Sequence, residues 1–115
     1  MKRFVRALDL RDGPGVVETY VAHHRAVWPQ VEASLRRIGI RRLEIYLLGR
    51  RLVMVMETDD GFDPERAFAP HLADPTCREW EELMKTFQQR VPCAGPDEWW
   101  ADMKEVYRLE GAGDA

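Results

Sequence analysis

The stretch that decides the fold runs from Ile40 to Thr58 and reads IRRLEIYLLGRRLVMVMET. Its first half, Ile40 to Leu48, alternates between two faces with a period of two, which is typical of a strand. Its second half, Arg51 to Thr58, is a mostly apolar run of strand length. Only Gly49-Arg50 separates the halves, so we expect an antiparallel hairpin with a tight turn.

The segment before the hairpin predicts a strand followed by a helix. Phe4 to Leu10 alternates as a short strand does, although Arg6 places a charge on the face of Phe4. After a turn at residues 11–15, apolar residues recur every three or four positions from about Val16 to Ile38. That spacing predicts an amphipathic helix.

Pro29 divides this helical segment. Its ring would clash with the carbonyl of Arg25, and proline donates no backbone hydrogen bond. The residue before a proline also avoids helical dihedral angles. We therefore expect a break between Arg25 and Trp28, with Pro29 opening a second helix that ends near Ile38.

The segment after the hairpin predicts two helices and a strand. Asp63-Pro64-Glu65 and Asp74-Pro75-Thr76 each combine a capping aspartate with a proline at the first helical position, so each is expected to begin a helix. An irregular loop from Val91 to Trp100 follows. Met103 to Leu109 is then expected to form the last strand.

The expected order is β-α-β-β-α-β, a ferredoxin-like α+β fold in which an antiparallel sheet carries helices on one face. We expect residues 1–110 to form a single domain and 111–115 to form a flexible tail. Strand residues such as Leu52 to Met56 are apolar on both faces, so the second face of the sheet must also be covered. A second copy of the chain would cover it in a dimeric α+β barrel.

Composition limits the classes of function. The 115 residues carry a formal net charge of −3, whereas nucleic-acid binding needs a clustered positive excess. The apolar runs are far shorter than the ~20 residues of a membrane span, and the charged N-terminus does not resemble a signal peptide. Cys77 and Cys93 make no disulfide framework and have no metal-ligand spacing. We expect a cytoplasmic protein that binds neither nucleic acid nor membrane.

The residues that suggest chemistry lie in the stretch YVAHHRAVWP, Tyr20 to Pro29. Tyr20, His24 and Trp28 stand four residues apart and share a helix face, and His24 falls within the apolar seam. His24 is either a core histidine that bonds a backbone carbonyl or a proton carrier. Aromatic neighbours would desolvate the ring and favour its neutral form, which both gives and takes a proton. His23 is expected at the surface.

Aromatic and acidic residues near this histidine suggest a sugar ligand. Tryptophan and tyrosine rings cover the apolar face of a pyranose, and Trp80 is a candidate beside Tyr20 and Trp28. At helical spacing, all three are also typical of core aromatics. Glu44 in mid-strand and the glutamates beside Trp80 are candidate hydrogen-bond acceptors. Trp99-Trp100 is either a pocket wall or a dimer contact.

No motif in the chain indicates a bound cofactor or metal. The chain has no glycine-rich phosphate loop, nucleophile elbow or paired-cysteine site. His23, His24 and His71 are not spaced as a helical pair of metal ligands.

Three groups of residues give the chain a family resemblance. They are Tyr20-x-x-x-His24-x-x-x-Trp28-Pro29, the Ile45-Tyr46 pair, and Cys77-x-x-Trp80 followed by Met84 and Pro92. From Ala7 to Leu109 the chain is similar to the L-rhamnose mutarotases. The resemblance implies a homodimeric α+β barrel that interconverts the anomers of a 6-deoxyhexose without a cofactor.

The resemblance also implies roles for single residues. The family's proton-donor histidine falls on His24, its substrate-binding helix tyrosine on Tyr20, and the first tryptophan of its Trp-Trp pair on Trp80. Its second tryptophan is Glu81 in this chain, and its strand tyrosine is Leu43. These departures replace an aromatic wall and a hydroxyl, so L-fucose joins L-rhamnose as an expected sugar.

We expect His24 to be catalytic and the sugar-binding residues to be Tyr20, Trp28, Glu44, Tyr46, Trp80 and Glu81. In anomer exchange one proton is added to the ring oxygen and another leaves the anomeric hydroxyl, and His24 would carry one of them. The partner group is Glu81, Glu44, Tyr20 or water, and the sequence does not choose among them. Two alternatives stay open: a cofactor-free monooxygenase or haem-degrading protein on the same fold, and a non-catalytic sugar or partner binder.

Overall fold

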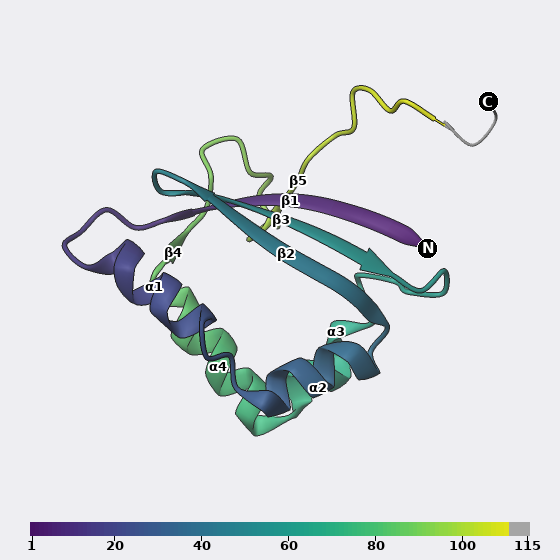
Figure 1. The fold of residues 1–115 in the computed structure, drawn as a ribbon, viewed down its shortest axis with the longest axis horizontal. Coiled ribbons are helices and arrows are strands. Elements are labelled where there is room, and N and C mark those ends of the chain that lie inside the picture. The colour runs from purple at the N-terminus through teal and green to yellow at the C-terminus, as the bar shows by residue number, and fades with distance from the viewer. Residues whose placement is uncertain (111–115) are drawn as a thin grey trace.

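A computed structural model describes residues 1–110 of the chain (Figure 1), so the tail expected at 111–115 lies outside the described residues. The strands are β1 (Lys2–Leu10), β2 (Ile40–Leu48), β3 (Arg51–Thr58), β4 (Gln88–Gln89) and β5 (Ala101–Asp102). The helices are α1 (Val16–His24), α2 (Pro29–Arg37), α3 (Phe68–Ala73) and α4 (Pro75–Lys85).

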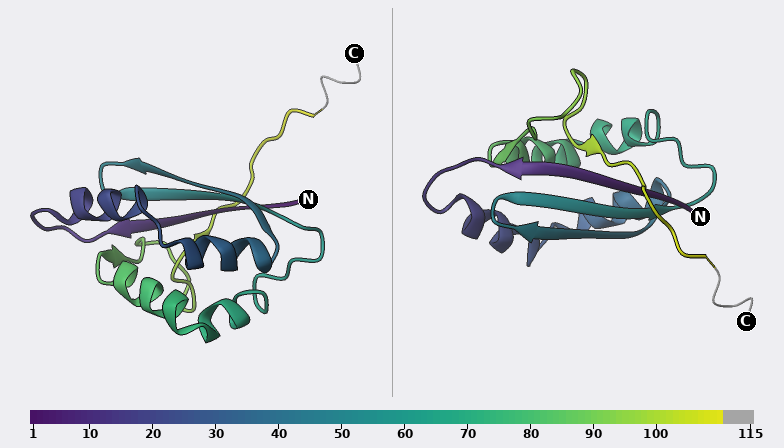
Figure 2. Two further views of the ribbon diagram at one scale, coloured as in Figure 1. Left: turned by 60° about the horizontal axis from the view of Figure 1, so that its bottom comes forward. Right: turned by 90° about the horizontal axis from the view of Figure 1, so that it is seen from above.

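The strands form one antiparallel sheet in the order β2-β3-β1-β4, with β5 pairing a second part of β1. All four helices lie on the same side of this sheet, as two views of the ribbon show (Figures 1 and 2). The predicted α+β, ferredoxin-like arrangement is therefore confirmed. The predicted bounds of the hairpin, Ile40–Leu48 and Arg51–Thr58, match β2 and β3, and Gly49 turns between them with a φ of +62°.

The strand register sorts side chains into two faces. One row across the sheet joins Leu43, Met56 and Phe4, and the next same-face row joins Ile45, Met54 and Arg6; both rows face the helices. The rows between them point the other way, because successive side chains of a strand alternate. Those rows place Glu44 beside Val55 and Tyr46 beside Val53 on the outer face.

The main core lies where α1, α2 and α4 pack on one end of the sheet. Leu10 and Leu52 come from the strands, and Tyr20, Val31 and Trp80 come from the helices. A Leu-sized buried side chain contributes roughly 1.5–3 kcal/mol relative to exposure. This packing holds the end of α1 close to the middle of α4.

The predicted break at Pro29 is confirmed. α1 ends at His24 and α2 begins at Pro29, while Trp28 is extended with φ −61° and ψ 129°. An extended residue before proline avoids the clash that a helical one would meet. His24 therefore stands at the carboxyl end of a helix, beside a short connecting segment.

One predicted helix start is confirmed and the other is wrong. Asp74 caps α4, since its carboxylate accepts from the backbone N–H groups of Thr76 and Cys77. Asp63-Pro64-Glu65 instead forms turns, and α3 begins only at Phe68. The Asp63 carboxylate accepts from the backbone N–H of Glu65, a local bond that competes with helix formation.

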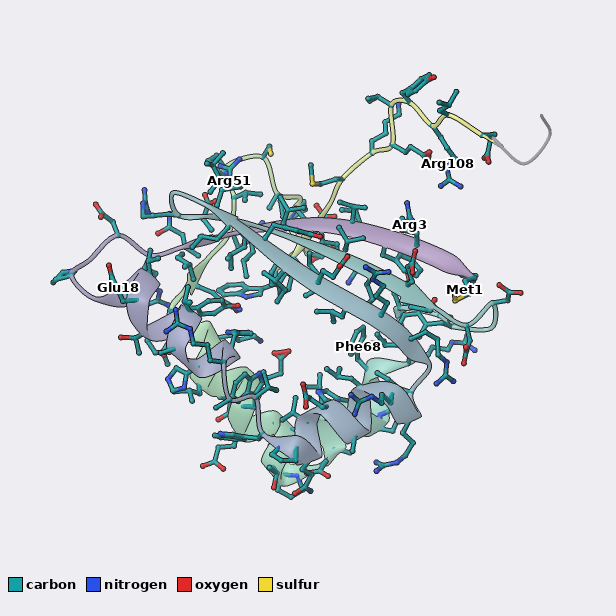
Figure 3. The ribbon with its side chains drawn as sticks, in the orientation of Figure 1. Met1, Arg3, Glu18, Arg51, Phe68 and Arg108 are labelled. Carbon is teal, nitrogen blue, oxygen red and sulfur yellow. The ribbon has the colours of Figure 1, made fainter. Side chains whose placement is uncertain are left out.

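The predicted last strand, Met103 to Leu109, is wrong. The edge of β1 is occupied by β4 and β5, which precede this segment. Beyond β5 the chain leaves the sheet on the side opposite the helices, and Arg108 lies far along it (Figure 3). Val106 and Leu109 are 91% and 82% exposed, so their strand-like pattern finds no partner in one copy of residues 1–110.

Candidate functional site

The candidate site is a cavity of about 620 Å³ between the sheet and the helices. Its polar end is lined from α1, α4, β4 and the segment leading into β5; its other end, toward α3, is lined by Phe68, Leu72 and His71. Phe68 lies between α3 and the sheet (Figure 3). Leu43, Ile45 and several other apolar side chains form much of the wall.

His24 lines the polar end, and its protonation can be worked out from one hydrogen bond. Its Nδ1 lies 2.9 Å from the carbonyl oxygen of Tyr20. A carbonyl oxygen only accepts, so Nδ1 carries a proton and, in the neutral ring, Nε2 has a free lone pair. Burial lowers the pKa of His24, although the Tyr20 carbonyl opposes this shift. The neutral ring, with Nε2 ready to accept a proton, is therefore favoured.

Trp80 and Trp28 form an aromatic pair beside this histidine. The ring of Trp80 lines the cavity with its centroid 5.6 Å from that of His24, at 71°. The ring of Trp28 lies 5.1 Å from that of Trp80 but does not line the cavity. Trp80 is placed to contact a ligand, and Trp28 supports it from behind.

Tyr20 lies behind the cavity wall rather than in it. Its side chain is only 3% exposed, and its ring is 4.5 Å from that of His24. Its hydroxyl accepts a hydrogen bond of 3.1 Å from Nε2 of Gln88. Burial raises the pKa of Tyr20 to about 12, so this hydroxyl stays protonated at neutral pH. In this structure Tyr20 reaches the cavity only through Gln88 and His24.

Gln88 and Trp99 also line the cavity. The sequence did not single out Gln88, and it left two alternatives for Trp99. The buried side-chain amide of Gln88 bonds Tyr20 through Nε2 and accepts a 2.8 Å bond from Nε1 of Trp99 through Oε1. The sequence predicted Trp99 to be either a pocket wall or a dimer contact, and in the structure its side chain lines the cavity. No sequence pattern marks Gln88, because its strand is only two residues long.

Glu81 follows Trp80 on α4 and also lines the cavity. Among residues 1–110 its carboxylate has no hydrogen bond or ion pair. Burial raises the pKa of Glu81, and the positive charge of Lys85 opposes that shift. Burial thus shifts Glu81 toward its protonated form, the form that can donate a proton.

Arg6, the unexpected charge on the apolar face of β1, points into the same cavity. Its side chain is 19% exposed, and its Nε donates a 2.8 Å bond to the carboxylate of Asp102. Pairing with Asp102 satisfies the cation in a partly buried place. The cavity lining thus combines the guanidinium of Arg6 with carboxylates from the segment leading into β5, Asp97, Glu98 and Asp102.

Besides Tyr20 and Trp28, which lie behind the cavity wall, two more of the expected sugar-binding residues do not line this cavity. Glu44 and Tyr46 project from the outer face of the sheet, opposite the helices. Glu44 pairs with Arg42 at 2.9 Å, and Tyr46 is 57% exposed. Their period-two spacing puts them on the face away from Leu43 and Ile45, which do line the cavity.

Residues 1–110 contain neither a cluster of metal-ligating side chains nor a helix that could span a membrane. No three His, Cys, Asp or Glu side chains in this range come together as a metal site would require. No helix within the same range is long and apolar enough to cross a membrane.

The chain is similar to known proteins over nearly its whole length. A family model described as L-rhamnose mutarotase matches residues 3–109. The L-fucose mutarotase of Xanthomonas campestris pv. campestris is 39% identical over 97% of this chain and 91% of its own length. The L-rhamnose mutarotase of Klebsiella pneumoniae is 25% identical over 90% of this chain and 96% of its own length.

Solved structures show the same fold. The crystal structure of L-rhamnose mutarotase from Formosa agariphila matches with a TM-score of 0.67, covering 96% of this chain and 100% of that one. The two sequences are 18% identical, so this likeness bears on the fold alone.

Proposed function

Because this chain belongs to the L-rhamnose mutarotase family and is an aldose mutarotase, we propose that it exchanges the α and β anomers of a 6-deoxyhexose through His24. One observation carries the assignment to His24: its imidazole lines the cavity beside Trp80, with Nδ1 committed to a backbone carbonyl and Nε2 free. A ring held in this tautomer is prepared to take a proton from a sugar hydroxyl.

Anomer exchange places modest demands on a site. The ring opens when the anomeric hydroxyl loses a proton and the ring oxygen gains one; rotation about C1–C2 and closure then give the other anomer. Positioned acid and base groups contribute roughly 10²–10⁴-fold to such steps. That acceleration is sufficient for a small site, because the same exchange already proceeds slowly in water without an enzyme.

We propose L-fucose as the preferred sugar. The support is the 39% identity to an L-fucose mutarotase, against 25% to an L-rhamnose mutarotase. Glu81 and Leu43 also stand where the family resemblance implies a tryptophan and a tyrosine. Leu43 and Ile45 offer an apolar wall for the methyl group of a 6-deoxyhexose. The Trp80 ring and the Gln88 amide offer an aromatic surface and hydrogen-bonding groups.

The two alternatives raised by the sequence are not favoured. Membership of the mutarotase family makes a monooxygenase or haem-degrading activity an unneeded assumption. A non-catalytic sugar binder is disfavoured because the chain is covered nearly from end to end by enzymes named as mutarotases.

The test is the rate of anomer exchange, measured by NMR saturation transfer with L-fucose, L-rhamnose and neighbouring sugars. We expect acceleration above buffer to be greatest for L-fucose and to vanish in His24→Ala. His23→Ala is the matched control, since His23 is adjacent in sequence but does not line the cavity. Full activity in a folded His24→Ala protein would contradict the role of His24, and preference for L-rhamnose would contradict the sugar.

We also propose that the protein acts as a homodimer in the cytoplasm. The dimer is supported by the outer face of the sheet, where Tyr46 and Leu48 are 57% and 83% exposed. It is also supported by the chain beyond β5, whose Val106 and Tyr107 are 91% and 75% exposed. Monomers rarely expose apolar groups of this size together. The cytoplasmic location stays a prediction from the sequence.

A further inference from the structure

We propose that Glu81 is the second catalytic group: its carboxyl donates a proton to the ring oxygen while Nε2 of His24 accepts the proton of the anomeric hydroxyl. This inference rests on the proposed mutarotase function and assigns the partner that the sequence left open.

The first argument is position. Glu81 lines the cavity directly after Trp80, whose ring lies 5.6 Å from that of His24. The flanking glutamates of α4, Glu79 and Glu82, are exposed and point away. Of the three glutamates, the helical repeat therefore places only Glu81 on the side of α4 that faces the cavity lined by His24.

The second argument is chemical need. The bond from Nδ1 to the Tyr20 carbonyl commits that nitrogen, so the neutral imidazole offers only a lone pair at Nε2. Such a ring starts the reaction as a base and leaves the ring oxygen without a proton. Opening the C1–O5 bond then requires an acid on another side chain or from water.

The third argument is the state of the Glu81 carboxyl. It has no hydrogen bond or ion pair among residues 1–110, and burial raises its pKa. The titratable groups that face it or His24 from the helices are Tyr20, His23 and Lys85. Across the cavity stand Arg6, His71, Asp97, Glu98 and Asp102.

Most of these cavity charges already have partners. Asp102 pairs with Arg6, and Glu98 accepts from the backbone N–H groups of Gly95 and Asp102. The Nδ1 of His71 is hydrogen-bonded to Ser34 at 2.7 Å. Among residues 1–110, Glu81 and Asp97 are the carboxyls of this lining without such a partner, and of these Asp97 is exposed whereas Glu81 is partly buried.

The proton balance closes. In ring opening, Nε2 gains the hydroxyl proton, the C1–O5 bond breaks as C1=O forms, and the Glu81 carboxyl gives its proton to O5. The enzyme then holds an imidazolium and a carboxylate. After rotation about C1–C2, the C5 hydroxyl attacks C1, its proton returns to Glu81, and the imidazolium protonates the former carbonyl oxygen.

The test compares Glu81→Gln with Glu82→Gln, an exposed neighbour on the same helix. Glutamine keeps the shape of the side chain but has no proton to donate. We expect Glu81→Gln to lower the maximal enzyme-dependent exchange rate by about 10²-fold, with a small change in KM, and Glu82→Gln to match the wild type. Circular dichroism and sugar-induced quenching of tryptophan fluorescence check folding and binding.

The pH dependence of the anomer-exchange rate is an independent test of the role of Glu81. The wild-type rate should fall on the acid side as His24 is protonated, below its usual pKa of about 6.5, and on the alkaline side as Glu81 loses its proton. The alkaline fall should disappear in Glu81→Gln. Glu81→Asp, which keeps an acid on a shorter side chain, should recover part of the rate and that fall.

Three results would overturn the proposal: a wild-type rate in Glu81→Gln, a change in KM alone, or an alkaline fall that survives the substitution. If the wild type accelerates no 6-deoxyhexose, the mutarotase function fails with it. If it does, and His24→Ala is inactive while Glu81→Gln is not, only the role of Glu81 fails.

Discussion

At the level of single residues, the site depends on which hydrogen bonds are already formed before a sugar arrives. The Nδ1–H of His24 donates a hydrogen bond to the backbone carbonyl of Tyr20, so the tautomer of the ring does not depend on any other side chain. Gln88 is held between the Tyr20 hydroxyl and the Trp99 indole. These contacts fix the orientation of the cavity side chains before the sugar binds. The side chains therefore need to reorganise less when charge develops during proton transfer.

The position of Tyr20 leads to a prediction that separates support from binding. Tyr20→Phe removes the hydroxyl and leaves one N–H of the buried Gln88 amide without its partner, so we expect a loss of roughly 1–3 kcal/mol in the free energy of unfolding. Urea titration followed by tryptophan fluorescence measures it.

Anomer exchange in the same variant tests the role in the site. Tyr20 does not line the cavity and its bond to His24 is through the backbone, so we expect KM to change by less than about tenfold, equivalent to 1.36 kcal/mol. A large rise in KM without a loss of stability would instead mean that the hydroxyl contacts the sugar.

At the level of elements, two helix termini position the chemistry. The break before Pro29 ends α1 at His24, where the last turn of the helix meets the cavity. The Asp74 cap begins α4, which carries Trp80 and Glu81 on its cavity side. The Asp74 carboxylate also accepts from the side-chain amide of Gln30, and so links α4 to α2.

The cap of α4 gives a prediction at this scale. Asp74→Ala removes the acceptor of the Thr76 and Cys77 N–H groups and should cost about 0.5–2 kcal/mol in the free energy of unfolding. Thermal unfolding followed by circular dichroism measures the loss. Asp12→Ala, an exposed loop aspartate, is the control and should unfold as the wild type does. Equal stability of the two variants would show that the cap contributes little.

At the scale of the whole molecule, the helices cover one face of the sheet and leave the other face open (Figure 2). The segment beyond β5 runs out on that open side, carrying the exposed side chains of Val106, Tyr107 and Leu109. A second copy would cover both features at once. The cavity lies on the helix side, so the proposed dimer would leave its entrance to the sugar unobstructed by the paired sheets.

The open face leads to the prediction for the assembly. The wild type should elute with the mass of a dimer in size-exclusion chromatography with light scattering. Leu48→Lys places a charge where an interface is proposed and should shift the protein toward monomer at low concentration. Thr19→Lys, on the exposed part of α1, should remain dimeric. A monomeric wild type at all concentrations would contradict the proposal.

The sequence by itself determined the features that depend on neighbours along the chain. The hairpin Ile40 to Thr58 and the break at Pro29 follow from side-chain period and proline sterics, which act over a few residues. The Asp74 cap is equally local. His24 could be singled out because a titratable ring interrupts an apolar seam.

Only the tertiary structure decided which distant segments meet. Met103 to Leu109 alternates like a strand, yet β4 and β5 occupy the edge of β1. The alternation of side chains along β2 predicts that Glu44 and Tyr46 share one face of the strand. It does not predict that the cavity lies on the opposite face. Gln88, Arg6 and Glu81 come from separate elements to line the same cavity as His24, because strand pairing and helix packing are set by burial over the whole chain rather than by local pattern.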